Sequence, residues 1–411
     1  MLPDGRPVGQ ERRSARQGEL SGQLPAQRGA AARPGRAAAL SVTGEQLSQD
    51  WKKRQARASR WGLRRGAWRV SELPRLWKCG LYLFDDEGTG VRLKEGSAYY
   101  DGLVTCGSIW SCPVCAARIR QRRSGEIEKA VLAHLAAGGG VEFPTFTLPH
   151  TRADALAETL GVVQKAWAST FRSRGVQAVL DSLGYDGRIR ATEITRGEWH
   201  GWHPHAHGLL FLEKPLTPEQ RELLLTALAR AWSAAVVRLG LARPGDVAEK
   251  GQLGGVTIRQ VTSSEVGNYL AKIQDHYGQE SSVGLEMARS DAKKGRKRSR
   301  TPFEILEGAA AGVARDVALW HEYEKATKGR RAIEWSRGLK ARFGVDERED
   351  EDLAAEDVDG DRIAWVPRPQ WYALVARKQE TELLDQAELG GADAVEVLLE
   401  TLTPPSREDE E

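Results

Sequence analysis

The 411-residue sequence is long enough for two or three domains, and no run of eighteen apolar residues is present that would predict a membrane-spanning helix. The N-terminus lacks the apolar core of a secretory signal, so we expect a cytoplasmic protein without a membrane partner. The net charge of +3 hides a segregation of charge, because residues 346–411 contain 21 acidic and 6 basic residues, which leaves an excess of 18 positive charges in the first 345. A body this basic favours a polyanionic partner such as nucleic acid.

The N-terminal part of the chain divides into two segments. Residues 1–50 are rich in Gly, Ala, Arg, Gln and Pro without periodicity, which predicts disorder. Residues 51–77 are basic, with Trp51, Trp61 and Trp68 interleaved among the charges. This mixture suits contact with phosphates and stacking on bases, and it equally suits an amphipathic segment that packs its Trp side chains on the body.

Residues 78–130 contain all four cysteines and form a predicted small module. The spacing is C-x5-C-x2-C with one further cysteine 27 residues earlier, and the residues are Cys79, Cys106, Cys112 and Cys115. In a protein expected to be intracellular, four such thiols favour a structural Zn²⁺ site over disulfides, with reduced core thiols as the alternative.

A helix is predicted to start near Pro113, directly after the CPVC pair. It has a basic face that we expect to contact DNA, formed by Arg118, Arg120, Arg122 and Arg123. A zinc site beside it would make the start of this helix rigid.

Residues 135–290 alternate between strand and helix patterns. The predicted strands are VEFPTFTLP, RIRATEIT, HPHAHGLLFL and GGVTIRQV, and the predicted helices cover 154–174, 217–239 and SSEVGNYLAKIQDHY. The order β-α-β-β-α-β, followed by one more helix, predicts an α+β fold of ferredoxin-like type, with an antiparallel sheet and helices on one face. Residues 291–345 are predicted to be a basic loop and a helical region, and residues 346–411 an acidic linker and a short αβ tail.

The stretch WHPHAHGLLFL places three histidines at alternate positions of a predicted strand. Alternation puts His203, His205 and His207 on one face, where imidazoles can bind a divalent metal. If the two preceding strands form an antiparallel hairpin centred near Trp199, Glu193 lies opposite His205 and provides a third ligand. A slip of one residue would move Glu193 to the other face, and an exposed His-rich edge strand remains the alternative.

In the helix SSEVGNYLAKIQDHY, Glu265, Tyr269 and Lys272 fall at positions i, i+4 and i+7 and therefore share one face. A tyrosine near a cation and a metal-bound phosphate can attack phosphorus, while the lysine supplies charge and the glutamate accepts a proton. Any surface helix can contain the same three residue types, so the spacing alone does not establish a catalytic role.

Together the two segments resemble the signature of the HUH endonucleases, specifically the rolling-circle replication initiators of plasmids from Gram-positive bacteria. The resemblance rests on the strand with Pro204, His205, Ala206 and His207, on the helix with Tyr269 and Lys272, on Glu265 four residues before the tyrosine, and on the upstream strand FPTFTLP. It covers about residues 78–345, and phrases such as CGSIWSCPVCAARI are similar to those of actinobacterial members. His203 departs from the usual pattern, so the resemblance assigns it no role.

The resemblance implies nicking and joining of plasmid origin DNA, single-stranded or extruded at the nick site. His205 and His207 would bind Mg²⁺ or Mn²⁺, and Tyr269 would form a 5′-phosphotyrosine and leave a 3′-hydroxyl primer. Glu265 would activate water for termination, with Tyr277 as a minor alternative nucleophile. A host polymerase and helicase are the implied partners.

Two other functions fit the same sequence. A conjugative relaxase or single-tyrosine transposase would share the metal and the tyrosine, although Glu265 and the cysteine segment favour the replication initiator. A non-catalytic, zinc-dependent DNA-binding regulator would keep the histidine strand without using it.

Overall fold

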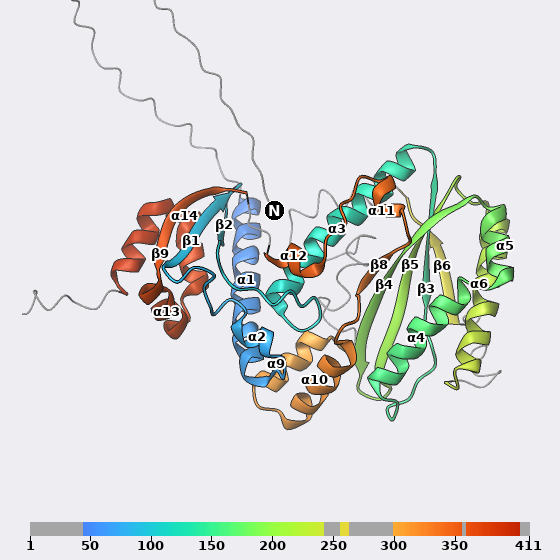
Figure 1. Cartoon of the computed structure of the whole chain (residues 1–411), viewed down its shortest axis with the longest axis horizontal. Coiled ribbons are helices and arrows are strands. Elements are labelled where there is room, and N and C mark those ends of the chain that lie inside the picture. Colours follow the sequence, from blue (N-terminus) through green and yellow to red (C-terminus); the bar gives the residue numbers. More distant parts are fainter. Residues whose placement is uncertain (1–43, 242–254, 263–298, 356–358, 403–411) are drawn as a thin grey trace, which may run out of the picture. The chain divides into compact units, whose positions relative to one another are not determined.

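The computed structural model describes residues 44–241, 255–262, 299–355 and 359–402 of the chain (Figure 1). Their strands form two antiparallel sheets, and helices pack around both. This arrangement confirms the predicted α+β class with an antiparallel sheet. Residues 44–411 belong to one unit of the chain.

The larger sheet has the strand order β6-β3-β5-β4-β7, and β8 pairs with β4 outside that path. Its strands are β3 (Gly140–Phe146), β4 (Tyr185–Gly197), β5 (Gly201–Leu212), β6 (Val256–Gln260), β7 (Ser299–Arg300) and β8 (Ile333–Trp335). The strands β3 to β6 and the helices between them follow the predicted order β-α-β-β-α-β. The strands β7 and β8 are too short to produce a periodic sequence pattern.

Helices cover both faces of this sheet, whereas the sequence pattern predicts helices on one face. The first face packs against α4 (Leu156–Thr170), α5 (Arg174–Ser182) and α6 (Pro218–Arg238), and the second against α3 (Pro113–Ala136) and α11 (Leu339–Arg342). The apolar run at the end of β5 explains the difference, because side chains alternate along a strand. Leu210 enters the core under α4 to α6, while Leu209 and Phe211 enter the core under α3.

The smaller sheet joins segments from opposite ends of the chain. It has the order β2-β1-β9, with β1 (Gly88–Lys94), β2 (Ser97–Tyr100) and β9 (Asp361–Pro367). The helices α13 (Arg368–Arg377) and α14 (Glu380–Glu400) pack on it through a core that includes Trp371, Leu383 and Val395. The C-terminal αβ segment is therefore a packed part of the fold, although its sequence reads as an acidic tail.

The basic segment near the N-terminus is helical, as α1 (Gly44–Val70) and α2 (Pro74–Lys78). Trp61 is buried with its ring 5.7 Å from that of Tyr100, Trp68 donates a hydrogen bond from Nε1 to the carbonyl of Cys79, and Trp51 is exposed. Two of the three tryptophans thus pack on the body, as one of the two predicted alternatives requires.

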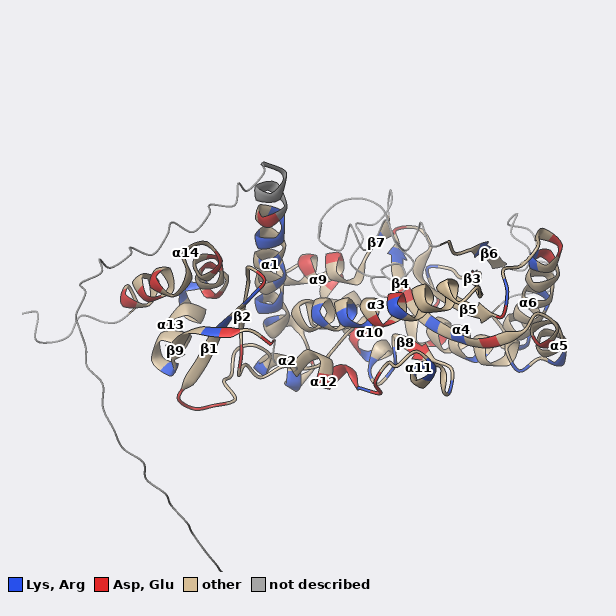
Figure 2. Ribbon diagram, turned by 90° about the horizontal axis from the view of Figure 1, so that it is seen from above, with Lys and Arg blue, Asp and Glu red and all other residues tan. Residues whose placement is uncertain are grey.

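Basic residues of α1 pair with acidic residues of α14 (Figure 2). Arg57 contacts Asp385 and lies 2.6 Å from Glu388, and Arg65 lies 3.0 Å from the buried carboxylate of Glu380. Part of the positive charge predicted for DNA contact is therefore neutralised within the protein.

Two further helices complete the described fold. α9 (Pro302–Ala310) begins at a capping box formed by Thr301 and Glu304, and α10 (Ala314–Thr327) packs beside it. Both contribute to a core around Trp320 and Tyr323 that also includes residues of α1 and α3. The predicted helical region after residue 300 is confirmed.

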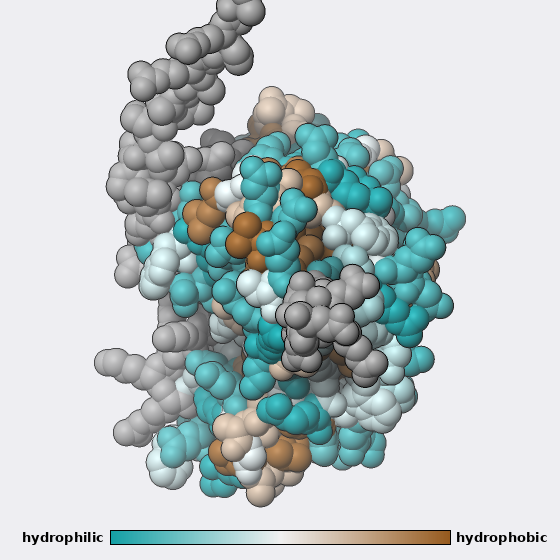
Figure 3. Space-filling model, turned by 90° about the vertical axis from the view of Figure 1, so that its left-hand side faces the viewer, coloured by the Kyte–Doolittle hydropathy of each residue, from teal (hydrophilic) through white to brown (hydrophobic). Residues whose placement is uncertain are grey.

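None of the described helices is long and apolar enough to cross a membrane. On the face that Figure 3 presents, hydrophobic residues form separate patches within a largely hydrophilic surface.

Candidate metal centre

The hairpin of β4 and β5 forms the candidate site. In its register Glu193 lies directly opposite His205, as the sequence predicts, and Thr195 lies opposite His203. Alternation then places the histidines on the face of the sheet that packs against α3 further along β5.

Glu193, His205 and His207 converge on one point. The Oε2 atom of Glu193 lies 2.8 Å from Nε2 of His205 and 2.8 Å from Nε2 of His207, and the three side chains are at most 13% exposed. Two ligands about 2.1 Å from an octahedral metal lie about 3 Å apart, close to the observed separations. One carboxylate oxygen and two imidazole nitrogens therefore form a donor set that fits a divalent cation.

The surroundings of Glu193 keep its carboxylate negatively charged, as a metal ligand must be. Burial raises the pKa of its carboxyl, but hydrogen bonds from His205 and His207 and the charges of their imidazoles outweigh this effect and lower the pKa well below the usual range. The carboxylate is therefore ionised at neutral pH, which is the state that binds a metal.

Contacts on its far side orient His207. Its Nδ1 lies 3.1 Å from Oγ1 of Thr145 in β3, and its ring stacks on Phe143 at a centroid distance of 5.3 Å. With Nδ1 engaged by the threonine, Nε2 is the nitrogen that faces Glu193. Thr145 belongs to the upstream strand FPTFTLP, but only the pairing of β3 with β5 indicates that it contacts His207.

His203 does not join this group. Its Nδ1 lies 3.4 Å from Nδ1 of His150, and the two rings are 4.6 Å apart, while its ring centroid is 5.0 Å from that of His205. The structure therefore pairs His203 with a histidine of the β3–α4 loop, a residue that no sequence motif singled out.

The predicted catalytic helix cannot be compared with this geometry. Glu265, Tyr269 and Lys272, and the alternative nucleophile Tyr277, lie outside the described residues. Their roles stay predictions.

The four cysteines meet in a second cluster. Cys79 ends α2, Cys112 caps α3, Cys115 lies in the first turn of α3, and Cys106 comes from the preceding loop. All four are buried, and the Sγ atom of Cys79 lies 3.6 Å from that of Cys112 and 3.5 Å from that of Cys115, with Cys106 to Cys115 at 3.8 Å. A tetrahedral Zn²⁺ with bonds of about 2.3 Å needs sulfurs about 3.8 Å apart, so the cluster fits such an ion.

The thiols of this cluster perturb one another. Burial raises the pKa of Cys112, whereas hydrogen bonds from Cys106, Cys112 and Cys79 lower the pKa of Cys115. A thiol whose pKa is lowered gives up its proton more readily, as binding of a soft metal cation requires.

The arginines predicted to contact DNA do not form one exposed face. Arg120 is buried and donates to the carbonyl of Ile109, Arg118 donates to the carbonyl of Ala354 at 2.6 Å, and Arg123 is buried between Glu126 and Asp350. Arg122 is exposed. Helix periodicity identified these residues, but packing turns two of them inward.

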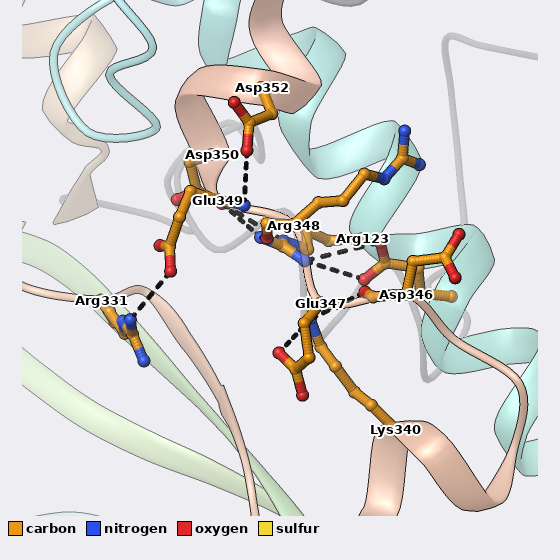
Figure 4. A network of polar contacts seen from close by, with 10 residues as sticks. Arg123, Arg331, Lys340, Asp346, Glu347, Arg348, Glu349, Asp350 and Asp352 are labelled. Atoms are coloured by element: carbon orange, nitrogen blue, oxygen red, sulfur yellow. Dashed lines mark hydrogen bonds and ion pairs between the residues drawn. The ribbon is translucent and has the colours of Figure 1, made fainter. Parts of the chain in front are cut away.

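The acidic segment after residue 345 folds back on this region (Figure 4). In it, Asp350 lies 3.0 Å from Arg123 and Glu349 lies 3.1 Å from Arg331. The segment continues into α12 (Asp350–Ala355), which packs on α3. In the described part of the chain, the predicted acidic linker therefore packs on the protein through ion pairs, and we call residues 346–355 the acidic strap.

Comparisons with known proteins agree with these features. Residues 104–228, which include the β4–β5 hairpin and three of the four cysteines, match the family described as replication protein. The chain is 31% identical over 373 residues to Protein rep from Streptomyces lividans, covering 74% of this chain and 80% of that protein. It is also 37% identical over 154 residues to a neomycin resistance protein from Streptomyces cyanogenus, covering 31% of this chain and 35% of that protein.

No solved structure matches the chain. The similarity to the Streptomyces lividans protein extends over most of both sequences, and the family match covers the hairpin that contains the candidate metal centre. The chain therefore belongs to the replication protein family, the plasmid Rep initiators.

Proposed function

We propose that this initiator is a metal-dependent HUH endonuclease that nicks and rejoins plasmid origin DNA through a covalent 5′-phosphotyrosine. The observation that carries the proposal is the convergence of Glu193, His205 and His207. It supports a metal function because one carboxylate and two imidazoles meet with their ligand atoms close together. An exposed His-rich strand would not require this arrangement.

When bound to this group, Mg²⁺ or Mn²⁺ would supply Lewis-acid polarisation of the scissile phosphate. His205 and His207 would hold the cation, Glu193 would supply the anionic ligand, and Thr145 would keep His207 in place. Tyr269 is the proposed nucleophile: its oxygen loses its proton and bonds to phosphorus, the bond from phosphorus to O3′ breaks, and the 3′ oxygen takes up one proton, so the transfer is balanced. Lys272 offsets charge on the phosphoryl oxygens.

The nick leaves a 3′-hydroxyl that a host polymerase would extend while a helicase separates the strands. In this proposal Glu265 activates a water molecule after one round, so that the regenerated origin is cut without a second tyrosine. The four-cysteine cluster is proposed to bind a structural Zn²⁺ that joins α2, the loop before α3 and α3 itself.

Adduct formation tests the nicking proposal. Purified protein with Mn²⁺ is incubated with labelled single-stranded fragments of the plasmid that carries the gene, and adducts that survive SDS are separated by electrophoresis. We expect an adduct with the natural chain, none with Tyr269→Phe, and none when His205 and His207 are both changed to Ala.

Tyr277→Phe is the matched control and should form the adduct normally. Adducts of Tyr269→Phe at the natural level would refute the assignment of the nucleophile. Absence of any adduct from the natural chain across the whole plasmid would favour the non-catalytic regulator.

A further inference from the structure

The turn between β4 and β5 exposes an aromatic side chain at the end of the strand that contains the histidines. Trp199 is 62% exposed, and the residues beside it in the turn, Glu198 and His200, are exposed as well. From Gly201 to His205 the strand rises about 13 Å. A mostly exposed indole is thus presented at the end of the hairpin, beyond the stretch of strand that leads to the candidate metal centre.

Arginines gather around the same turn. Arg196, the last arginine of β4, pairs by its backbone with Arg300 of β7, and its guanidinium lies 5.7 Å from the ring centre of Trp202. Arg152 lies against the turn, because a Cβ added at Gly201 would come within 2.8 Å of its Cα. Figure 2 shows basic residues on β7 beside the end of β4.

The charges in this group are only partly balanced. Arg300 is paired with Asp316 of α10 at 2.7 Å, and Arg315 directly precedes Asp316 in that helix. Arg152 and Arg315 have no carboxylate partner among the residues that the structure describes. Burial and the charges of Arg315, Arg152 and Arg300 lower the pKa of Arg196, while Glu322 raises it.

The other acids near this turn have partners of their own or are exposed. Both carboxylate oxygens of Glu322 accept hydrogen bonds, one from the backbone N–H of Leu156 and one from Nε1 of Trp202. Glu198 is the exposed acid of the turn itself. Asp154 follows Arg152 by two residues and accepts hydrogen bonds from the backbone N–H and the hydroxyl of Thr151. Within the described residues none of these acids forms an ion pair with Arg152, Arg196 or Arg315, so an anion bound between the arginines would relieve their like-charge repulsion.

We propose that this hairpin end binds the single DNA strand beside the scissile phosphate. Trp199 stacks on an unpaired base, and Arg152, Arg196 and Arg315 contact the neighbouring phosphates. An exposed aromatic ring beside cations suits single-strand binding, because every unpaired base can stack on the ring and every phosphate carries a negative charge. Duplex DNA keeps its bases stacked and would use only the arginines. The inference rests on the proposed function, because it places substrate DNA at the candidate metal centre.

Binding of two labelled 20-mers separates stacking from charge. One is oligodeoxythymidylate, and the other is an abasic strand with the same phosphates and no bases. The buffer contains no added Mg²⁺ or Mn²⁺ and no chelator, so neither cleavage nor stripping of the cysteine cluster intervenes. Trp199→Ala should weaken thymidylate binding by about 5-fold to about 150-fold and leave the abasic strand unaffected. Trp199→Phe should keep most of the affinity.

The arginines predict a different signature. Arg152→Ala combined with Arg315→Ala should weaken binding of both strands and reduce the salt dependence by about 0.7 for each lost phosphate contact. Trp365→Ala, which removes a partly exposed indole from β9 in the other sheet, is the control and should bind both strands normally. Thermal unfolding verifies that every variant is folded.

Equal binding of thymidylate by Trp199→Ala and the natural chain would overturn the proposal, and so would equal weakening on both strands. Unchanged DNA binding would instead assign the turn to a protein partner. The two proposals can be refuted separately. If the natural chain forms the adduct and Trp199→Ala binds thymidylate normally, only this inference is refuted. Selective loss of thymidylate binding in a chain that forms no adduct refutes only the nicking.

Discussion

Replacing Thr145 by Val tests how the metal centre is held together. Valine has nearly the same shape as threonine but cannot hydrogen-bond to Nδ1 of His207, which lies 3.1 Å from Oγ1 of Thr145 in the structure. When a cation occupies Nε2, the proton of this imidazole resides on Nδ1, so the variant leaves a buried N–H without its acceptor.

The size of the effect follows from what remains around His207. Loss of an outer partner of a metal ligand costs about 10-fold to 100-fold in metal affinity, or about 1.4 to 2.7 kcal/mol. The ring of His207 is also held by stacking on Phe143 and its side chain is only 6% exposed, so part of its orientation survives. We therefore expect a loss of about 10-fold in Mn²⁺ affinity for Thr145→Val.

Mn²⁺ binding is measured by electron paramagnetic resonance of the free ion and by calorimetry, without DNA. Thr145→Ser keeps the hydroxyl and should bind Mn²⁺ almost as the natural chain does. Thr257→Val is the matched control, because Thr257 is the neighbour of Thr145 on β6 and is exposed. Natural Mn²⁺ affinity in a folded Thr145→Val variant would refute the orienting role.

Three further outcomes are expected. The purified natural chain should contain about one Zn²⁺ by elemental analysis, and Cys112→Ser should lose it and unfold at a lower temperature; a metal-free natural chain of full stability would contradict the zinc proposal. Asp101 is buried, which raises its pKa, but hydrogen bonds from Arg92, Arg362 and the backbone of Gly90 lower that pKa overall. The ionised Asp101 therefore stabilises the fold above about pH 4, and this stabilisation is lost as pH falls through the folded pKa. Asp101→Asn should lower the free energy of unfolding in urea by about 3 kcal/mol at pH 7 and by much less near pH 3. Arg122→Ala should weaken binding to duplex origin DNA and lower the unfolding temperature less than Arg123→Ala, which removes a buried partner of Asp350; the reverse pattern would contradict the roles given to these two arginines.

The sequence by itself determined the parts that follow from backbone periodicity. Alternation of histidines with Pro204 and Ala206 is enough to place them on one face, and a hairpin of that length puts Glu193 opposite His205, as the structure confirms. The order of strands and helices between residues 140 and 260 follows from the same local patterns. These features depend on neighbours in sequence, so the local pattern contains the information.

Only the tertiary structure decided which distant segments meet. Thr145 reaches His207 because β3 pairs with β5, and Cys79 closes the cysteine cluster because α2 ends against the first turn of α3. Arg122 and Arg123 are neighbours in sequence, but Arg123 is buried against Asp350, 227 residues away, while Arg122 is exposed. Such contacts depend on how the whole chain packs. The position of a residue along its helix or strand determines which neighbours share its face, but not which distant segment packs against that face.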